Sequence, residues 1–367
     1  MNKINLGIIF GGKSTEHEIS LISAKNIINA ADKKKYNIYP IGISKKGEFL
    51  IYVGNDYIID SHDAKKVRLN TNGLPITFSF GQNRELIGIL DQNFKIKLDV
   101  IFPVLHGVSG EDGTIQGLLE MTNIPYVGAN VLGSAIGMDK EITKIILKNS
   151  GIKIANFLTF NSLERKKISF SQIVSRLGLP FFVKPVKTGS SVGVHKIKNR
   201  KDFDEGMKDA FGFDKRIIFE EAIIGREIEC SVLGNENALV SLPGEVIPTH
   251  EFYSYEAKYL DENGAKFVIP AKLPEPVIKN IQEIARKTFK LLGCEGMARV
   301  DGFLKENNEF ILNEINTIPG FTAISMYPKL WEVSGISQKE MIDRLIQLAV
   351  ERFNKEKAIK TLFLYKR

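Results

Sequence analysis

Residues 299–320 read RVDGFLKENNEFILNEINTIPG, and this stretch decides the fold of the C-terminal half of the chain. Two apolar runs, Met297 to Leu304 and Phe310 to Ile315, flank the polar residues 305–308. Apolar runs of this length on either side of a short polar turn are typical of a β-hairpin. We therefore predict two antiparallel strands here.

The polar side chains of this hairpin are expected to share one face of a sheet. Side chains alternate between the two faces of a strand, so Arg299 and Asp301 point the same way. The same holds for Glu314 and Asn316 on the second strand. Carboxylates held close together repel unless a cation joins them, and oxygen ligands without His or Cys suit Mg²⁺ or Mn²⁺. Mg²⁺ often binds phosphate oxygens as well, which implies a nucleotide.

The alternative is a solvated hairpin edge that binds nothing. The turn at residues 317–321, TIPGF, follows Asn316 directly and brings a free backbone N–H beside the ligands. This turn favours the metal site over the solvated edge.

Composition limits the possible functions. The 367 residues are enough for two or three domains, and 43% hydrophobic with 25% charged residues is typical of a globular protein. The net charge of +7 comes from dispersed lysines without an aromatic-basic stripe, so no nucleic acid partner is expected. No apolar run approaches the roughly twenty residues that span a bilayer, and no signal peptide is recognised. Cys230 and Cys294 lie far apart in apolar runs, which favours reduced core cysteines and a cytoplasmic protein.

The first part of the chain has an α/β pattern. Residues 6–10 and 36–43 are predicted strands, and the loop 11–15 opens a helix near Glu16. The loop lacks the spacing of a dinucleotide fingerprint or of a complete P-loop, so neither site is predicted. Glu16 is either a partner of the helix dipole or a ligand for an ammonium group. Residues 45–97 contain short hairpin-like runs and little chemistry.

A glycine-rich loop, residues 106–113, follows a third predicted strand at 99–105 and leads into a helix over 114–123. Loops at the carboxyl ends of strands are where α/β sheets bind ligands. His106 at the start of the loop is either a structural histidine bonded to its own loop or a site residue.

The alternation of strand and helix restarts after residues 125–133, which indicates a domain boundary. A helix starting at Met138-Asp139-Lys140 is predicted to carry Ile142, Ile145 and Ile146 on its apolar side.

Segments of the second half indicate a nucleotide site. Lys184 lies near the end of an apolar strand and is followed by the small-residue loop 188–194, whose N–H groups can face a phosphate. Hairpin turns also use Gly and Ser, but the neighbouring lysine favours phosphate. Residues 217–222 form an apolar strand ending in groups able to bond an adenine edge. Residues 250–266 lack periodicity and are typical of a long lid loop.

Taken together, these motifs resemble those of the D-alanine–D-alanine ligases of the ATP-grasp superfamily. The matching segments occur in the family's order over nearly the whole chain and are residues 11–20, 106–117, 138–140, 184–193, 255–259 and 299–325. Each segment alone is a weak signal, whereas the set is specific.

The resemblance implies an α/β fold, α+β in the C-terminal half. This is an ATP-grasp fold preceded by a Rossmann-like pre-ATP-grasp domain. The implied domains are an N-terminal substrate-binding domain over 1–130, a small central ATP-grasp subdomain over 131–221, and a C-terminal domain over 222–367 with the lid loop and metal site. ATP would lie between the sheets of the last two.

The resemblance also implies a reaction. The carboxylate of one D-alanine attacks the γ-phosphate of ATP, and the amine of a second D-alanine takes the acyl group from the acyl phosphate, which gives D-alanyl-D-alanine for peptidoglycan. By position, the ATP-binding residues are Lys140, Lys184, Glu220, Glu221, Ile223, Glu227 and Lys258. The positions of the metal ligands, for two Mg²⁺ or Mn²⁺ ions, are Asp301, Glu314 and Asn316.

Substrate positions are also implied. Glu16 would hold the ammonium of the first D-alanine with His106 nearby, and Ser325 the carboxylate of the second. Arg299 and the Gly320 N–H would form the oxyanion hole.

A triad of Glu16, Ser190 and Tyr259 would tie the lid to the other domains. Tyr259 is the last residue of the motif Tyr-x-Ala-Lys-Tyr at 255–259. By the resemblance, this motif favours an amine over D-lactate as the acceptor. The alternative is that Tyr259 is an ordinary aromatic residue of the loop without a role in acceptor choice.

Competing interpretations are a D-alanine–D-lactate or D-alanine–D-serine ligase of the same fold, a non-catalytic nucleotide-binding regulator, and a Rossmann oxidoreductase. A regulator needs no oxyanion hole or amino-acid anchors, so Arg299, Glu16 and Ser325 disfavour it. The missing fingerprint disfavours the oxidoreductase. The expected partners are D-alanine and ATP, with no membrane, and the expected assembly is a homodimer.

Overall fold

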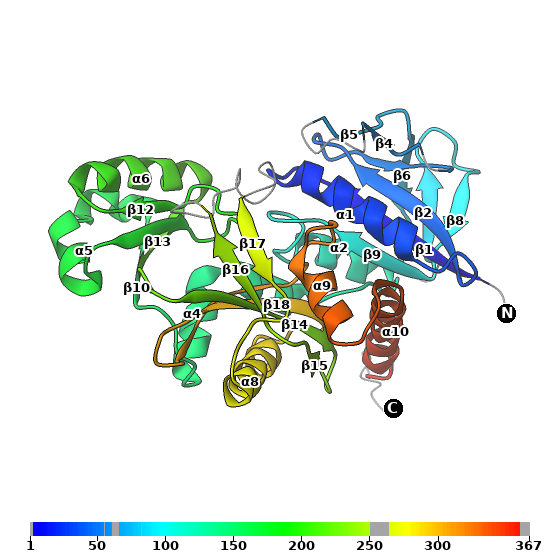
Figure 1. Ribbon diagram of the computed structural model, residues 1–367. Helices are drawn as coiled ribbons and strands as arrows, with labels where there is room; N and C mark the ends of the chain where they lie inside the picture. Colours follow the sequence, from blue (N-terminus) through cyan, green and yellow to red (C-terminus); the bar gives the residue numbers. More distant parts are fainter. Residues whose placement is uncertain (1–2, 55, 61–65, 82, 250–263, 360–367) are drawn as a thin grey trace, which may run out of the picture.

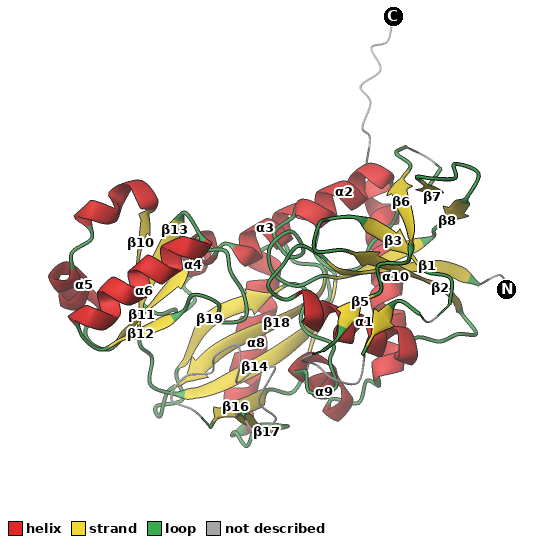
Figure 2. Ribbon diagram, turned by 90° about the horizontal axis from the view of Figure 1, so that it is seen from above, coloured by secondary structure: helices red, strands yellow, loops and turns green. Residues whose placement is uncertain are grey.

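The computed structural model describes residues 3–54, 56–60, 66–81, 83–249 and 264–359 (Figure 1). Three large sheets lie in a row, with the N-terminal sheet at one end, a four-stranded sheet at the other and a six-stranded sheet between them (Figure 2). Helices cover the sheets, so the predicted α/β class is confirmed.

The N-terminal sheet has a parallel core. Strand β1 (Ile4–Gly11) lies between β2 (Tyr36–Ile43) and β9 (Val100–Val104), and both pairings are parallel. Helix α1 (His17–Ala30) follows β1, and α2 (Thr114–Thr122) follows the glycine-rich loop after β9. All five elements agree with the predicted ones within two residues.

The short runs predicted between residues 45 and 97 extend this sheet with antiparallel strands in the order β8-β7-β6-β3-β2. Two further short strands pair only with each other. The bounds are β3 Phe49–Ile51, β4 Ile58–Ile59, β5 Arg68–Leu69, β6 Leu74–Phe78, β7 Glu85–Gly88 and β8 Lys95–Lys97.

The four-stranded sheet is antiparallel and carries an aromatic core. Its order is β10-β13-β11-β12, with bounds Phe157–Asn161, Arg216–Glu221, Phe181–Pro185 and His195–Ile197. Helices α5 (Phe170–Leu177) and α6 (Arg200–Phe213) pack on one face through Phe181, Phe203 and Phe219, and a 3-10 turn spans Ser162–Lys167. Burial of these rings leaves the opposite face for Lys184 and its neighbours.

The six-stranded sheet contains the predicted hairpin. Its main order is β17-β16-β14-β18-β19, with bounds Ala265–Val268, Gly244–Pro248, Arg226–Gly234, Gly296–Leu304 and Phe310–Asn316, and β15 (Leu239–Val240) pairs β14. Helix α8 (Glu275–Leu291) buries Ile281, Ala285 and Thr288. The loop predicted over 250–266 is shorter at its end, because Ala265 and Lys266 already belong to β17; residues 250–263 lie outside the described part.

Two segments connect the layers. Helix α3 (Val131–Met138) and helix α4 (Lys140–Asn149) lie beside the six-stranded sheet, and α9 (Met326–Val333) leads to α10 (Gln338–Lys357). Helix α10 packs on the N-terminal sheet, where its Leu345 joins the core of Phe102. Ser337 caps the N-terminus of α10, since its Oγ accepts the Glu340 N–H at 3.3 Å.

The predicted apolar side of α4 is largely wrong. Ile142 and Ile145 are 39% and 42% exposed, and only Ile146 packs on the core. The buried face carries Thr143, Lys144 and Leu147 instead. Lys144 can lie on this buried face because the carboxylate of Glu220, on strand β13, is its ion-pair partner. The helix sequence alone does not reveal this partner.

Both cysteines are buried and free, as predicted. No helix in the described ranges is long and apolar enough to cross a membrane.

Candidate active site

The β18–β19 hairpin brings its four polar side chains together. In register, Arg299 faces Asn316 and Asp301 faces Glu314. The Asp301 carboxylate accepts from Arg299 Nε at 2.8 Å and Nη2 at 2.6 Å, and from Asn316 Nδ2 at 2.8 Å. The predicted polar face is confirmed, and the alternative of a solvated edge is wrong because Asp301 is only 4% exposed.

The donor set of this face fits a hard divalent cation. Asp301 and Glu314 supply carboxylate oxygens and Asn316 an amide, which is the ligand chemistry of Mg²⁺ or Mn²⁺. Across the residues that the structure describes, no three His, Cys, Asp or Glu side chains cluster as a metal site. A soft-metal centre of the zinc type therefore finds no support in this part of the chain.

One pocket beside the hairpin contains every predicted ATP-binding residue that the structure describes. They come from the central and C-terminal sheets and from the N-terminus of α4. The lining includes Lys140, Lys184, Glu220, Glu221, Ile223, Glu227 and Glu314. Lys258 lies outside the described residues. We call this space the nucleotide-side pocket.

A buried charge cluster lies at this pocket. Lys184 Nζ is 2.6 Å from Glu220 Oε2, and Lys144 Nζ is 3.2 Å from Glu220 Oε1. Burial alone would raise the pKa of the Glu220 carboxyl, but the two lysine charges outweigh burial and lower it to about 2. The same carboxylate outweighs burial at Lys184 and raises the pKa of its ammonium. Two cations therefore share one anion.

The sequence interpretation missed Lys144, because a lysine on a helix is usually solvated. Its spacing of four residues from Lys140 was the available signal. Lys140 itself donates from Nζ to the Thr188 carbonyl at 2.6 Å and so contacts the small-residue loop.

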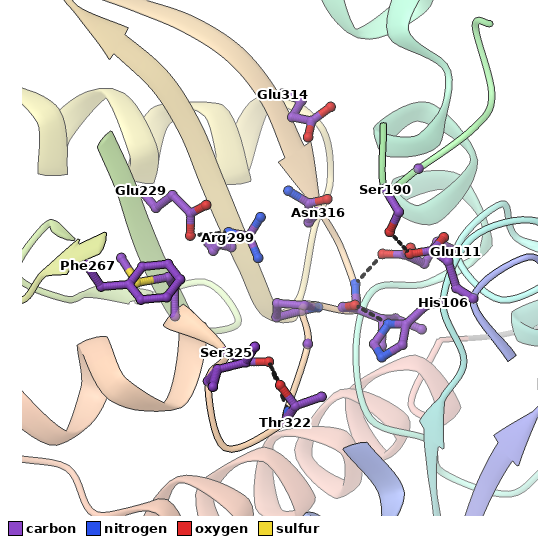
Figure 3. Close-up of a pocket in the computed structure, with 17 residues that line it drawn as sticks. His106, Glu111, Ser190, Glu229, Phe267, Arg299, Glu314, Asn316, Thr322 and Ser325 are labelled. Atoms are coloured by element: carbon purple, nitrogen blue, oxygen red, sulfur yellow. Dashed lines mark hydrogen bonds and ion pairs between the residues drawn. The ribbon is translucent and has the colours of Figure 1, made fainter. Parts of the chain in front are cut away.

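A second pocket, farther along the same face of the sheet, contains the predicted catalytic and substrate residues of the described part (Figure 3). We call it the substrate-side pocket. Its lining includes Glu16, His106, Ser190, Arg299, Gly320 and Ser325. Glu314, Gly189 and Ser190 line both pockets, so the two spaces meet at the hairpin and the loop.

The carboxylate of Glu16 links two parts of the chain. Glu16 holds the N-cap position of α1 without a side-chain cap bond, and Ser190 Oγ donates to its Oε1. A Cβ on Gly107 or Gly189 would lie 2.5 or 2.9 Å from Glu16 Oε2, so a larger residue at either position would displace the Glu16 carboxylate. Of the predicted triad, the Glu16–Ser190 contact is present, and Tyr259 lies outside the described residues.

His106 is a buried, neutral site residue. Its Nδ1 lies 3.1 Å from the Ile318 carbonyl and its Nε2 lies 3.2 Å from Ser23 Oγ, so its partners come from other segments and not from its own loop. Burial is the main cause that lowers the pKa of His106 to about 4, and the charge of Arg299 adds to it.

The turn after β19 is closely packed. A Cβ on Gly320 would lie 2.7 Å from Ser325 Oγ, which explains the glycine. Ser325, the N-cap residue of α9, accepts from the Thr322 N–H at 2.9 Å. The predicted Gly320 and Ser325 therefore lie side by side.

Two further carboxylates line the substrate-side pocket and were not predicted. Glu111 accepts from the N–H groups of Gly107 and Ile318 at 2.9 and 3.0 Å. Burial and then the nearby Glu16 charge raise the pKa of Glu111 to about 8. Glu229 Oε2 lies 2.9 Å from Arg299 Nε. The alternation of polar residues at 227, 229 and 231 was the one sequence signal for Glu229.

Comparisons with known proteins agree with this geometry. The descriptions "D-ala D-ala ligase N-terminus" and "D-ala D-ala ligase C-terminus" match residues 5–129 and 146–347. A D-alanine–D-alanine ligase of Oceanobacillus iheyensis is 52% identical over 360 residues, 98% of each chain. A D-alanine–D-alanine ligase A of Escherichia coli K12 is 46% identical over 362 residues, 98% of this chain and 100% of that one.

Solved structures give the same result. The D-alanine–D-alanine ligase of Coxiella burnetii matches with a TM-score of 0.84 and 39% identity, covering 98% of this chain and 97% of that one. A D-Ala:D-Ser ligase of Enterococcus faecalis matches with a TM-score of 0.82 and 35% identity, covering 95% of this chain and 100% of that one.

Proposed function

Because the chain belongs to the D-alanine–D-alanine ligase family and has its ATP-grasp fold, we propose that its two pockets join two D-alanine molecules with the hydrolysis of ATP to ADP and phosphate. The observation that carries this function is the meeting of the two pockets at one acidic hairpin. Phosphoryl transfer needs charge neutralisation and alignment more than covalent catalysis, and the pockets provide both. The product, D-alanyl-D-alanine, serves peptidoglycan synthesis.

In the first step a D-alanine carboxylate oxygen bonds to the γ-phosphorus of ATP, and the bond to ADP breaks. In the second step the amine of another D-alanine attacks the acyl carbon, loses a proton and expels phosphate. Both steps place negative charge between the pockets. Arg299, which is buried and has a pKa held well above its usual range because Asp301 and Glu229 outweigh burial, stays cationic throughout.

The nucleotide-side pocket would hold ATP. Lys140 and Lys184 would contact the phosphates, and Glu227 the ribose. The adenine would lie against Glu220 and the backbone of Glu221 and Ile223, where β13 ends. The excess positive charge of the lysine cluster supports this assignment.

The metal would be held by Asp301, Glu314 and Asn316. Mg²⁺ or Mn²⁺, two ions by the resemblance, would neutralise phosphate charge. The oxygen donors of this face and the burial of Asp301 support the assignment.

The substrate-side pocket would hold both amino acids. Glu16 would bind the ammonium of the first D-alanine with His106 nearby, and Ser325 the carboxylate of the second. Arg299 and the Gly320 N–H would form the oxyanion hole.

Other features of the proposal rest on the resemblance alone. They are the γ-phosphate contact of Lys258, the role of Tyr259 in the triad and in acceptor choice, the homodimer and the domain limits 1–130, 131–221 and 222–367. The proposed cytoplasmic location rests on the two free cysteines.

The direct test is a coupled assay of the purified protein. With ATP, Mg²⁺ and D-alanine we expect one phosphate released per D-alanyl-D-alanine formed, with no phosphate released when D-alanine is left out. A sample that releases no phosphate with all three present would exclude the function.

A second candidate is the D-alanine–D-serine ligase, favoured only by the match to the Enterococcus faecalis structure. Product analysis with D-alanine, D-serine and D-lactate as acceptors across pH separates it from the first. We expect D-alanine to be the preferred acceptor, and Tyr259→Phe to relax the preference for an amine.

A further inference from the structure

We infer that Glu229 is a positioning residue that holds the Arg299 guanidinium at the substrate-side pocket. The inference rests on the proposed ligase function and deepens it. Glu229 lies on β14 directly opposite Asp301 of β18, so the two carboxylates project from the same face of the sheet. Arg299 is the buried cation next to both. Figure 3 shows its guanidinium beside Glu229.

The guanidinium is held from two sides. Its Nε lies 2.9 Å from Glu229 Oε2 and 2.8 Å from Asp301 Oδ1, and its Nη2 lies 2.6 Å from Asp301 Oδ2. These contacts use Nε and Nη2, so Nη1 is not part of them. A guanidinium fixed along that edge can present its remaining nitrogen to an oxyanion without first ordering its long side chain.

Asp301 alone is a poor anchor for this purpose. It also accepts from Asn316 Nδ2 at 2.8 Å, and it is a proposed metal ligand. A carboxylate that shares its charge with a cation and an amide holds Arg299 less firmly. Glu229 is not among the proposed ligands, so its charge remains with Arg299 whatever the metal does.

A merely structural role for Glu229 would cost folding stability, because its carboxylate is buried. Glu229 is 6% exposed, and a buried carboxylate destabilises a fold unless a partner compensates it. An apolar side chain on this central strand would pack without that cost. The carboxylate is therefore best explained by what it does to Arg299.

The test compares Glu229→Gln with the unmodified enzyme. The variant keeps the shape and one acceptor oxygen but removes the charge. We expect kcat/KM for the acceptor D-alanine to fall about tenfold, a usual scale for the coupling of two side chains in one salt-bridge network. We expect the Kd for Mg²⁺-ADP, measured by calorimetry, to stay within about twofold, because Glu229 lines only the substrate-side pocket.

The matched control is Glu309→Gln. Glu309 is ion-paired to Lys153 and to Lys305 at 3.3 Å on the same hairpin, and it lines neither pocket. We expect this variant to leave both the kinetics and the nucleotide Kd unchanged. This control measures the effect of removing a glutamate charge from the same hairpin away from both pockets.

A double-mutant cycle with Arg299→Lys isolates the contact. Lysine has no guanidinium for Glu229 to orient, so Glu229→Gln should lose most of its effect in that background. If Glu229→Gln does not fold, Glu229→Asp, which keeps the charge on a shorter side chain, replaces it in the same assays.

Two results would overturn the inference. One is an acceptor kcat/KM for Glu229→Gln within twofold of the unmodified enzyme. The other is a parallel loss of Mg²⁺-ADP affinity and melting temperature, which would indicate a general structural role. If the proposed function were wrong, the unmodified protein would form no D-alanyl-D-alanine. That result is distinct from the two above, in which the unmodified protein is active.

Discussion

Two groups of buried charges beside the β18–β19 hairpin, one at each pocket, have opposite balances of charge. On the nucleotide side, Lys144 and Lys184 share the single carboxylate of Glu220. On the substrate side, Glu16, Glu111 and Glu229 line the same pocket as one guanidinium, that of Arg299. The lysine cluster at the first pocket has excess positive charge, whereas the buried charges of the second pocket have excess negative charge.

The difference matches the ligands that each side would bind. Phosphates are stabilised by the lysine cluster, whereas the ammonium group of an amino acid is stabilised by carboxylates. Of the proposed metal ligands, Glu314 lines both pockets and Asn316 lines the substrate-side pocket. The comparison also explains why Glu111 is protonated more easily than Glu220, since one borders a carboxylate and the other two lysines.

Removing the substrate-side cation should have the largest effect. We expect Arg299→Ala to lower turnover by roughly 10²–10³, the usual scale for one oxyanion donor, while Mg²⁺-ADP affinity stays nearly intact. Steady-state kinetics and calorimetry measure the two quantities. An equal fall in nucleotide affinity would show that the two pockets do not act separately.

Removing the nucleotide-side anion should destabilise the fold. Glu220→Gln leaves two buried lysines without their carboxylate, and breaking a buried ion pair in this way typically costs about 3–5 kcal/mol of unfolding free energy. Urea denaturation measures this cost. A change below about 1 kcal/mol would mean that the lysines find other partners.

The pH dependence of stability should depend on His106. Its pKa in the folded state, about 4, lies below the ordinary 6.5, so the unfolded chain binds more protons between these values. The contribution of His106 to stability should therefore be complete above pH 6.5 and fall as pH drops toward 4. The contribution is at most roughly 3 kcal/mol, at 1.36 kcal/mol per pKa unit.

The check compares urea denaturation of the wild type and His106→Gln between pH 4 and pH 7.5. We expect the slope of stability against pH to be smaller in the variant. Identical slopes would show that His106 does not titrate in this range.

The smallest effect is expected where the loop meets the N-terminal domain. Ser190→Ala removes the hydrogen bond to Glu16, and we expect the KM for the first D-alanine to rise about tenfold. Ser175→Ala on α5, where the hydroxyl bonds only its own helix at Gln172, serves as the control. An unchanged KM would indicate that the contact does not order the substrate-side pocket.

Much of the fold follows from local patterns. The alternation of apolar and polar residues predicted the hairpin and its polar face, and the glycine-rich loops marked the ends of strands. The pockets then brought together residues that the resemblance had grouped by position.

The site residues that the sequence did not reveal have their partners in distant segments of the chain. Lys144 is buried because Glu220 faces it from β13, and Glu229 contacts Arg299 across a strand pairing. Glu111 bonds a backbone N–H 207 positions away. A buried charge is recognisable only when its counter-charge is known, and periodicity places such residues on the surface.

The most direct measurement is a crystal structure of the protein with Mg²⁺ and a non-hydrolysable ATP analogue. The account predicts metal density between Asp301, Glu314, Asn316 and the analogue's phosphates, with the adenine near Glu220. A nucleotide bound elsewhere, or a hairpin that holds no metal at saturating Mg²⁺, would contradict it.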